Sequence, residues 1–254
     1  GVKLGLGLFD TTNWVGEAGQ VPLVASNLQS GASWSGTAAL VNSTNAVLLR
    51  YRDVETNGLA NLNCREGSLR FWFKPEWNSA TTNSGTGPQG EARLFEVGSA
   101  GTNTGWWAVL VNSNGTQLSL RTQTNGVGVT NLTATINWRS NDWHQVALSY
   151  GPTNTVLYVD GVAVTNGTGV TAYPNAAERA LGFGIGSDTA GNRQAKGRFD
   201  ELETFNYGLA ANVVSNELQQ AINSPLFDKD GDGVSNWEDS AVNDPNIGRP
   251  VLSP

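Results

Sequence analysis

Residues 143–161 read WHQVALSYGPTNTVLYVDG, and this stretch decides the fold class of the chain. Apolar residues stand at positions 146, 148 and 150, the spacing that places side chains on one face of a β-strand. A second run of β-branched and aromatic residues follows and ends in Asp160-Gly161, a dipeptide suited to the positive φ angles of a tight turn. The stretch therefore predicts two strands, over 143–150 and 154–161.

The same alternation recurs along most of the chain and is interrupted by Asn-Gly and Gly-rich breaks. Strands at a spacing of roughly ten residues, with no helical pattern between them, are typical of an antiparallel sandwich. One short helix is expected over 209–222, where four apolar residues form a stripe. Residues 78–90 lack any periodicity and are expected to form an irregular loop at the rim. The further predicted strands lie over 46–54, 67–75, 92–98, 105–112, 117–124 and 197–205.

Composition excludes several classes of function. The chain has 254 residues, 39% hydrophobic and 15% charged, and is rich in Gly, Asn, Ser and Thr, which favours a β-rich extracellular module. A net charge of -7 argues against nucleic-acid binding, because no basic patch is available to replace phosphate counterions. No run of about 18 apolar residues exists that could span a membrane. Cys64 is the single cysteine, which excludes an intrachain disulfide.

Four motifs follow one another along the chain, at Trp72 to Pro75, Trp143 to Ala147, Tyr158 to Gly161 and Asp200 to Leu209. Together they give the chain a family resemblance. It resembles the laminin-G-like domains of the concanavalin A-like superfamily over roughly residues 1–220. The resemblance implies a jelly roll of two curved sheets, often with a glycan or protein ligand near the concave face or the rim. The fold hosts lectins, hydrolases, adhesion modules and spacers, so the resemblance alone does not select a function. In the family's pattern the last motif is Asp-Glu-x-x-x-(aromatic)-Asn-x-x-Leu, where x is a variable position, and residues Asp200 to Leu209 match it.

Residues 228–239 read DKDGDGVSNWED and have the spacing of a twelve-residue calcium loop. Hard oxygen ligands at alternate positions are what Ca²⁺ requires, and a glycine at position 6 allows the sharp turn. The loop resembles thrombospondin type 3 repeats and dockerin half-loops. Position 12 holds Asp239 in place of the usual Glu, and Glu238 stands one place early, so the last ligand is left open between them. The expected ligands are Asp228, Asp230, Asp232, the carbonyl of Val234, Asn236 and Asp239.

Glu201 and Glu203 are the alternative catalytic residues. Glycoside hydrolases use two carboxylates on either side of the scissile bond, and residues two apart on a strand share a face. The competing interpretation gives the neighbouring Asp200-Glu201 pair a role in local hydrogen bonding. His144 is the single histidine and lies inside a predicted strand, where a structural role is expected.

Nine tryptophans in a charge-poor chain could supply platforms for sugar rings, because an aromatic face packs against the apolar C–H face of a sugar. Trp77 is expected to be the exposed candidate, since it stands beside the polar 78–90 loop. Trp106 and Trp107 point to opposite faces of one strand, so at least one of them belongs to the core. Trp77 and Trp106 are therefore the candidate carbohydrate-binding residues.

Taken together, the sequence predicts an all-β, antiparallel two-sheet jelly-roll sandwich with one short C-terminal helix and a calcium-binding loop. The jelly roll is expected over 1–223, and a linker with the calcium loop over 224–254. The expected function is non-catalytic carbohydrate binding or adhesion within a larger secreted bacterial protein, with Ca²⁺ as cofactor and a polysaccharide or glycan as partner. Two alternatives remain: a glycoside hydrolase, and a spacer or protein-interaction domain.

Overall fold

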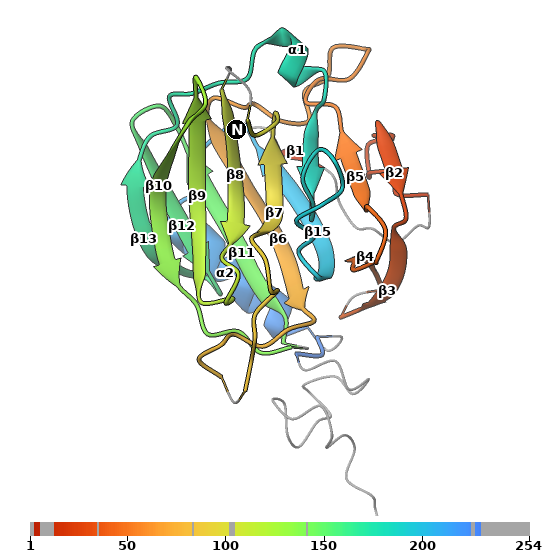
Figure 1. The fold of residues 1–254 in the computed structure, drawn as a ribbon, viewed down its shortest axis with the longest axis vertical. Coiled ribbons are helices and arrows are strands. Elements are labelled where there is room, and N and C mark those ends of the chain that lie inside the picture. The colour runs from red at the N-terminus through yellow and green to blue at the C-terminus, as the bar shows by residue number, and fades with distance from the viewer. Residues whose placement is uncertain are drawn as a thin grey trace, which may run out of the picture.

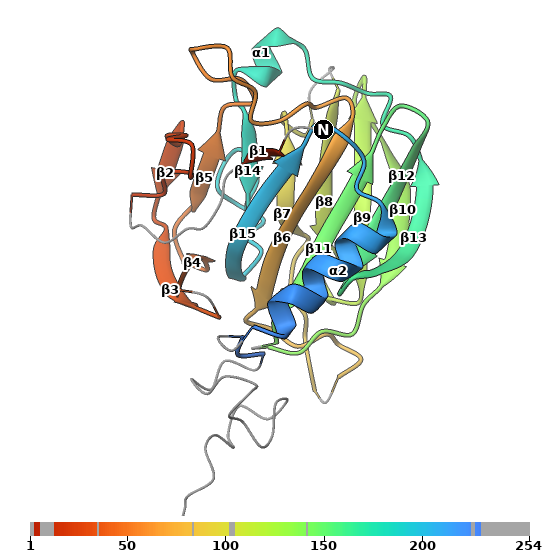
Figure 2. The same cartoon turned by 180° about the vertical axis from the view of Figure 1, so that it is seen from behind.

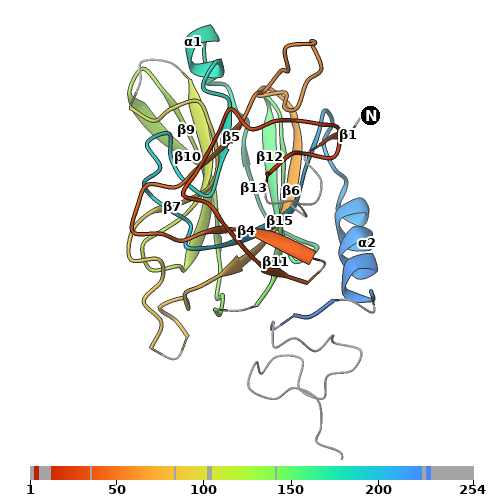
Figure 3. The same ribbon diagram turned by 90° about the vertical axis from the view of Figure 1, so that its right-hand side faces the viewer.

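The computed structural model describes residues 3–5, 13–34, 36–82, 84–101, 105–140, 142–224 and 227–229. Within these residues two antiparallel sheets pack face to face, as the side view in Figure 3 shows. This arrangement confirms the predicted two-sheet sandwich. One sheet carries a helix on its outer face, while the other faces the viewer in Figure 1.

Eight strands of the described chain form the first sheet, called sheet A. Seven of them follow one another across the sheet, and β1 (Lys3–Gly5) pairs with β15 off this path. In spatial order they are β13 (Val162–Thr168), β12 (Asn154–Val159), β11 (His144–Tyr150), β6 (Gly67–Pro75), β15 (Gly197–Phe205), β4 (Gly36–Val41) and β3 (Gln29–Ser33).

Sheet B has seven strands within the described residues. Their spatial order is β10 (Val127–Thr135), β9 (Gln117–Thr124), β8 (Trp106–Val111), β7 (Ala92–Val97), β14 (Phe183–Ile185), β5 (Leu48–Tyr51) and β2 (Val24–Ser26). The chain moves from sheet B to sheet A between β5 and β6, through residues 52–66. This crossing segment, called the 52–66 loop, lies at one end of the sandwich.

The core lies between the two sheets, because the period-2 pattern turns one face of each central strand inward. Phe73 of sheet A contacts Phe199 with ring centroids 4.9 Å apart. On sheet B, Phe95 stacks on both Phe183 and Trp107, at 5.3 and 5.7 Å. These aromatic rings are buried and supply much of the apolar surface removed from water.

The helix α2 (Ala211–Ile222) lies along the outer face of sheet A and crosses its central strands (Figure 2). It begins two residues after the predicted start and ends where the sequence predicts. Val214 is its fully buried residue, and Leu218 packs against the Trp72 cluster. A second helix, α1 (Ala176–Arg179), is a single turn capped by the side chain of Asn175.

The first residues after α2 return to sheet A. Phe227 is 1% exposed and its ring lies 5.2 Å from that of Trp34 and 5.3 Å from that of Trp72. The backbone N–H of Trp143 donates to the carbonyl of Lys229 at 3.1 Å. The described part of the expected linker is therefore held on the sandwich.

Candidate ligand-binding groove

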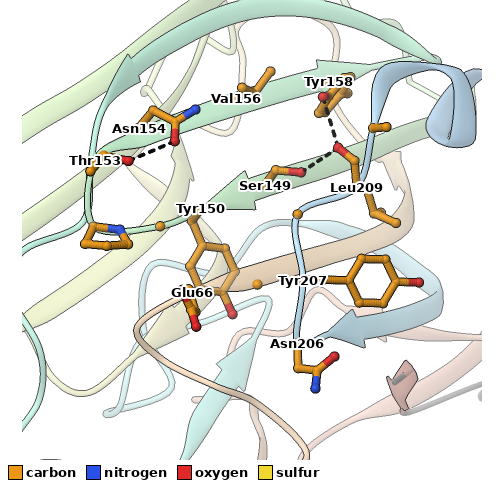
Figure 4. Close-up of a pocket in the computed structure, with 15 residues that line it drawn as sticks. Glu66, Ser149, Tyr150, Thr153, Asn154, Val156, Tyr158, Asn206, Tyr207 and Leu209 are labelled. Atoms are coloured by element: carbon orange, nitrogen blue, oxygen red, sulfur yellow. Dashed lines mark hydrogen bonds between the residues drawn. The ribbon is translucent and has the colours of Figure 1, made fainter. Parts of the chain in front are cut away.

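A groove of about 550 Å³ opens on the outer side of sheet A (Figure 4). It is bordered by the end of β11, by β12 from Asn154 to Tyr158, by the start of β6, and by the loop that joins β15 to α2. This last segment, residues 206–210, is called the 206–210 loop. The groove thus combines segments that are far apart in the sequence but meet at one end of the sandwich.

Three hydroxyl groups of sheet A hold the 206–210 loop in place. Ser68 donates to the carbonyl of Tyr207, and its oxygen accepts from the N–H of Leu209 at 2.8 Å. Ser149 and Tyr158 both donate to the carbonyl of Leu209, at 3.1 and 3.2 Å, as the dashed lines in Figure 4 show. These bonds satisfy backbone groups that cannot join the sheet, so the loop has a defined position.

Tyr207 gives the groove an accessible aromatic ring. It is 40% exposed, and its ring lies edge-on to that of Phe205 with centroids 5.6 Å apart. Asn206 precedes it, and Asn154 stands across the groove in Figure 4; both are exposed. A half-open aromatic ring among amide donors and acceptors is suited to a sugar, which has apolar C–H faces and hydroxyl groups.

Tyr150 is one of the residues that line the groove, although most of its side chain is buried. Its hydroxyl donates to the carbonyl of Asn63 at 2.7 Å, which ties the 52–66 loop to β11. Burial raises the pKa of Tyr150 far above that of a free phenol, so the group stays neutral and acts as a fixed donor.

The groove contains one carboxylate among its lining residues, that of Glu66. Hydrolysis of a glycosidic bond uses a pair of carboxyl groups at a set separation. A single carboxylate among amides and hydroxyls can accept hydrogen bonds from sugar hydroxyls. The lining residues therefore supply groups that can form hydrogen bonds with a sugar.

Trp77, predicted to be exposed, is instead 6% exposed. Its ring stacks on Trp138 at 6.1 Å, and its indole N–H donates to the carbonyl of Ala195 at 2.9 Å. The hairpin turn at Gly115 packs so closely on the ring that a Cβ there would lie 2.5 Å from it. The sequence-based expectation of exposure is wrong because Trp138 and the turn at Gly115 pack against the indole. One edge of Trp77 still borders a cavity of about 310 Å³.

Trp106 lies on the outer face of sheet B and is 3% exposed. It clusters with Ala108 and Leu110, and the guanidinium of Arg93 lies 5.0 Å from its ring centre. The alternation of Trp106 and Trp107 is confirmed, since Trp107 belongs to the core between the sheets. Sugar binding by Trp77 and Trp106 stays a prediction from the sequence.

Glu201 and Glu203 lie on β15 at a bulge, where the register against β6 shifts between Asp200 and Glu203. Glu201 has a φ of 46°, and its N–H donates to the carboxylate of Asp200 at 2.8 Å. Glu203 forms an ion pair with Arg70 and is partly buried. Neither glutamate lines the groove, and their catalytic role stays a prediction.

Most of the predicted calcium loop lies outside the described residues. Asp228 is described, directly after the buried Phe227, whereas Asp230, Asp232, Val234, Asn236 and Asp239 are not. Among the residues that the structure does describe, no group of three or more His, Cys, Asp or Glu side chains is placed to hold a metal ion.

The groove residues were not predicted from the sequence, because the candidate binding residues were chosen among the tryptophans. Tyr207 stands at a variable position of the motif from Asp200 to Leu209, directly after a strand. An aromatic residue followed by glycine, directly after a strand, was the available signal. Glu66 and Asn154 carried no signal of their own, because only the fold brings their segments together.

Comparison with known families finds one match. A laminin-G family model, described as the concanavalin A-like lectin/glucanases superfamily, matches residues 42–215. No curated protein is similar enough in sequence to match this chain. No helix in the described part of the chain is both long and apolar enough to cross a membrane.

Solved structures share the fold at low sequence identity. Domain 4 of AbnA, a GH43 extracellular arabinanase from Geobacillus stearothermophilus solved with arabinotriose, is 18% identical, with a TM-score of 0.53 over 75% of this chain and 81% of that one. The binding domain of Paraclostridial Mosquitocidal Protein 1 is 13% identical, with a TM-score of 0.63 over 86% and 52%. The binding domain of Botulinum Neurotoxin DC, solved in complex with SialylT, is 13% identical, with a TM-score of 0.57 over 86% and 51%. The chain spans about half the length of these two toxin domains.

Proposed function

Because the chain belongs to the concanavalin A-like lectin/glucanases superfamily, we propose that it is a non-catalytic carbohydrate-binding module whose ligand occupies the groove at Tyr207. The observation that carries this proposal is the composition of the groove. It offers one accessible aromatic ring, several amides and hydroxyls, and a single carboxylate.

Two further observations support a binding role. The 206–210 loop is fixed by Ser68, Ser149 and Tyr158, so little ordering is required when a ligand binds. One structural neighbour was solved with arabinotriose, and another, the binding domain of Botulinum Neurotoxin DC, was solved in complex with SialylT. We place the module in an extracellular protein of bacterial origin, consistent with the low charge and the single cysteine.

We also propose that the acidic segment starting at Asp228 binds Ca²⁺ and stabilises the end of the chain. The support is its sequence spacing, with oxygen ligands at alternate positions and a glycine at the turn. In this proposal the metal has a structural role, and the glycan binds to the sandwich and not to the acidic segment.

A glycan array followed by isothermal titration calorimetry tests the groove. The wild-type protein is expected to bind at least one oligosaccharide, and Tyr207→Ala is expected to weaken that binding at least tenfold. This corresponds to about 1.4 kcal/mol, within the range for the loss of an aromatic contact. Tyr207→Phe keeps the ring and is the matched control, so it should retain most of the affinity.

Other outcomes would favour the alternatives. A protein that binds no glycan on the array would support the spacer or protein-interaction role. Release of reducing ends from mixed polysaccharides, abolished by Glu201→Gln or Glu203→Gln, would support the hydrolase. If Tyr207→Ala binds as tightly as the wild type, the ligand site lies elsewhere.

A further inference from the structure

A second cavity, of about 350 Å³, lies where the 52–66 loop leaves β5. From its lining we infer that it recognises the carboxylate of an acidic sugar, with Arg52 as the recognising residue. This inference deepens the proposed carbohydrate-binding function and rests on it. The residues that line the cavity include Gln20, Val21, Arg52, Glu55, Leu59 and Asn61.

Arg52 differs from most arginines of the described chain because its charge is not paired. Seven others form ion pairs with carboxylates, namely Arg50, Arg70, Arg93, Arg121, Arg179, Arg193 and Arg198. Arg52 is half-buried, and its guanidinium forms no hydrogen bond or ion pair with the rest of the described chain. A planar guanidinium with five N–H donors matches a carboxylate in two parallel hydrogen bonds.

Glu55, the one carboxylate that lines this cavity, is engaged by another partner. It accepts a hydrogen bond from the side-chain amide of Asn61 at 2.6 Å. The same amide donates to the carbonyl of Arg52 at 2.9 Å, and Asn61 is 3% exposed. A buried asparagine therefore holds Glu55 in place, and the cation of Arg52 is left for an external anion.

The rim of the cavity suits a sugar ring better than a small inorganic anion. Val21 and Leu59 are 56% and 64% exposed and border the same space as Arg52. Exposed apolar side chains beside a cation can contact the C–H face of a sugar whose carboxylate reaches the guanidinium. Gln20, a buried residue of the lining, adds a polar group.

The 52–66 loop links this cavity to the groove. Asn61 lies in the cavity lining and Glu66 in the groove lining, and five residues of chain span at most about 18 Å. Two hydrogen bonds hold the loop in place between the cavity and the groove. The carbonyl of Asn61 accepts from the hydroxyl of Thr204, and the carbonyl of Asn63 accepts from the hydroxyl of Tyr150. One glycan chain can thus reach both places, with an acidic unit at Arg52 and a neutral unit beside Glu66.

NMR spectroscopy of the arginine Nε–H groups tests the inference directly. The protein is titrated with glucuronate, galacturonate and mannuronate, and with glucose, galactose and mannose, each to about 10 mM, where weak sites become visible. The Nε–H resonance of Arg52 and the amide of Leu59 are expected to shift with at least one acidic sugar and not with its neutral counterpart. Arg52→Gln should abolish the response of Leu59.

Arg65→Gln is the matched control, because Arg65 is an exposed arginine of the same loop that lines neither cavity. It should leave the response unchanged. In oligosaccharides that bind, Arg52→Gln is expected to reduce the preference for the acidic over the carboxyl-reduced form about tenfold.

The inference is overturned if no acidic sugar shifts Arg52, if the neutral sugars shift it equally, or if Arg52→Gln keeps the response. Failure of the proposed groove gives a different result. In that case Tyr207→Ala would bind neutral oligosaccharides like the wild type, while the Arg52 resonance would still respond to the acidic sugars.

Discussion

The hydroxyl of Ser68 on β6 donates a hydrogen bond to the backbone carbonyl of Tyr207, which is 139 residues further along the chain. The same oxygen accepts the N–H of Leu209. One fully buried side chain therefore connects the 206–210 loop to the centre of sheet A. The position of the exposed tyrosine ring depends on this connection.

Ser68→Ala is predicted to lower both stability and ligand affinity. It removes the partner of a backbone carbonyl and of an N–H at a buried position, which costs about 1–3 kcal/mol of unfolding free energy. Urea denaturation measures the stability, and titration calorimetry with an array-selected glycan measures the affinity. The control is Ser149→Ala, where Tyr158 still donates to Leu209, so a smaller loss is expected. Equal losses in both variants would contradict the assigned role of Ser68.

Phe227→Ala is predicted to destabilise the whole sandwich by about 3–5 kcal/mol, the usual cost of removing a buried aromatic side chain. The reason is that Phe227 packs against both Trp34 and Trp72, whose rings also contact each other, in a cluster that includes Leu218 and Ile222 of α2. Phe227→Leu keeps most of the apolar volume and should cost less. Thermal and urea unfolding measure both variants. A loss below about 1 kcal/mol in Phe227→Ala would show that the segment after α2 is not docked in solution.

Glu91 is predicted to make stability depend on pH. Burial alone would raise its pKa, but Arg93, Arg121 and Arg193 lower it below the ordinary value for glutamate. A group with a lower pKa in the folded state binds fewer protons there than in the unfolded chain. The contribution of Glu91 to the free energy of unfolding is therefore complete above its unfolded-state pKa. It is lost as the pH falls through the folded-state pKa.

Glu91→Gln should consequently be less stable than the wild type at neutral pH, by about 1–2 kcal/mol. The difference should shrink in acid, below the range where a free glutamate titrates. Urea unfolding across a pH series measures it, and Glu66→Gln, an exposed carboxylate, serves as control. A difference that stays constant down to strong acid would contradict the prediction.

Removal of calcium is predicted to lower the melting temperature. A ligand bound only by the folded state stabilises it by mass action, by about 2.7 kcal/mol at a concentration one hundred times Kd. Calorimetry with and without chelator measures the shift, and elemental analysis measures the bound metal. The double variant Asp230→Asn with Asp232→Asn should be insensitive to chelator. Absence of metal together with an unchanged melting temperature in the wild type would refute the calcium proposal.

The strands with strong alternation were predictable from the sequence. β6, β9 and β15 begin and end where the apolar periodicity does, and β11 differs by one residue. β10 and β13 were missed because they are largely exposed and a register shift interrupts the alternation of each, between Thr130 and Leu132 in β10 and between Ala163 and Thr165 in β13. In such strands pairing with the neighbouring backbone decides the structure, and the side chains carry little periodic signal.

The groove could not be derived from the sequence for a different reason. Which face of a strand or turn stays open depends on what the rest of the chain places over it. Trp77 is covered by the turn at Gly115, and Trp106 is covered by Arg93, whereas Tyr207 is left accessible. The sequence shows where the aromatic residues stand. Which of them is exposed to solvent is decided by tertiary contacts between segments that are distant in the sequence.

The burial of the tryptophans determines how this protein is best followed by spectroscopy. Trp14, Trp72, Trp77, Trp106, Trp107, Trp138 and Trp143 are all buried. Indole emission depends on contact with water, so intrinsic fluorescence here should shift strongly to the red on denaturation and little on glycan addition. The emission maximum is thus a reporter of folding. Occupancy of the groove requires a different signal, such as a fluorophore attached near Tyr207 or the heat of binding.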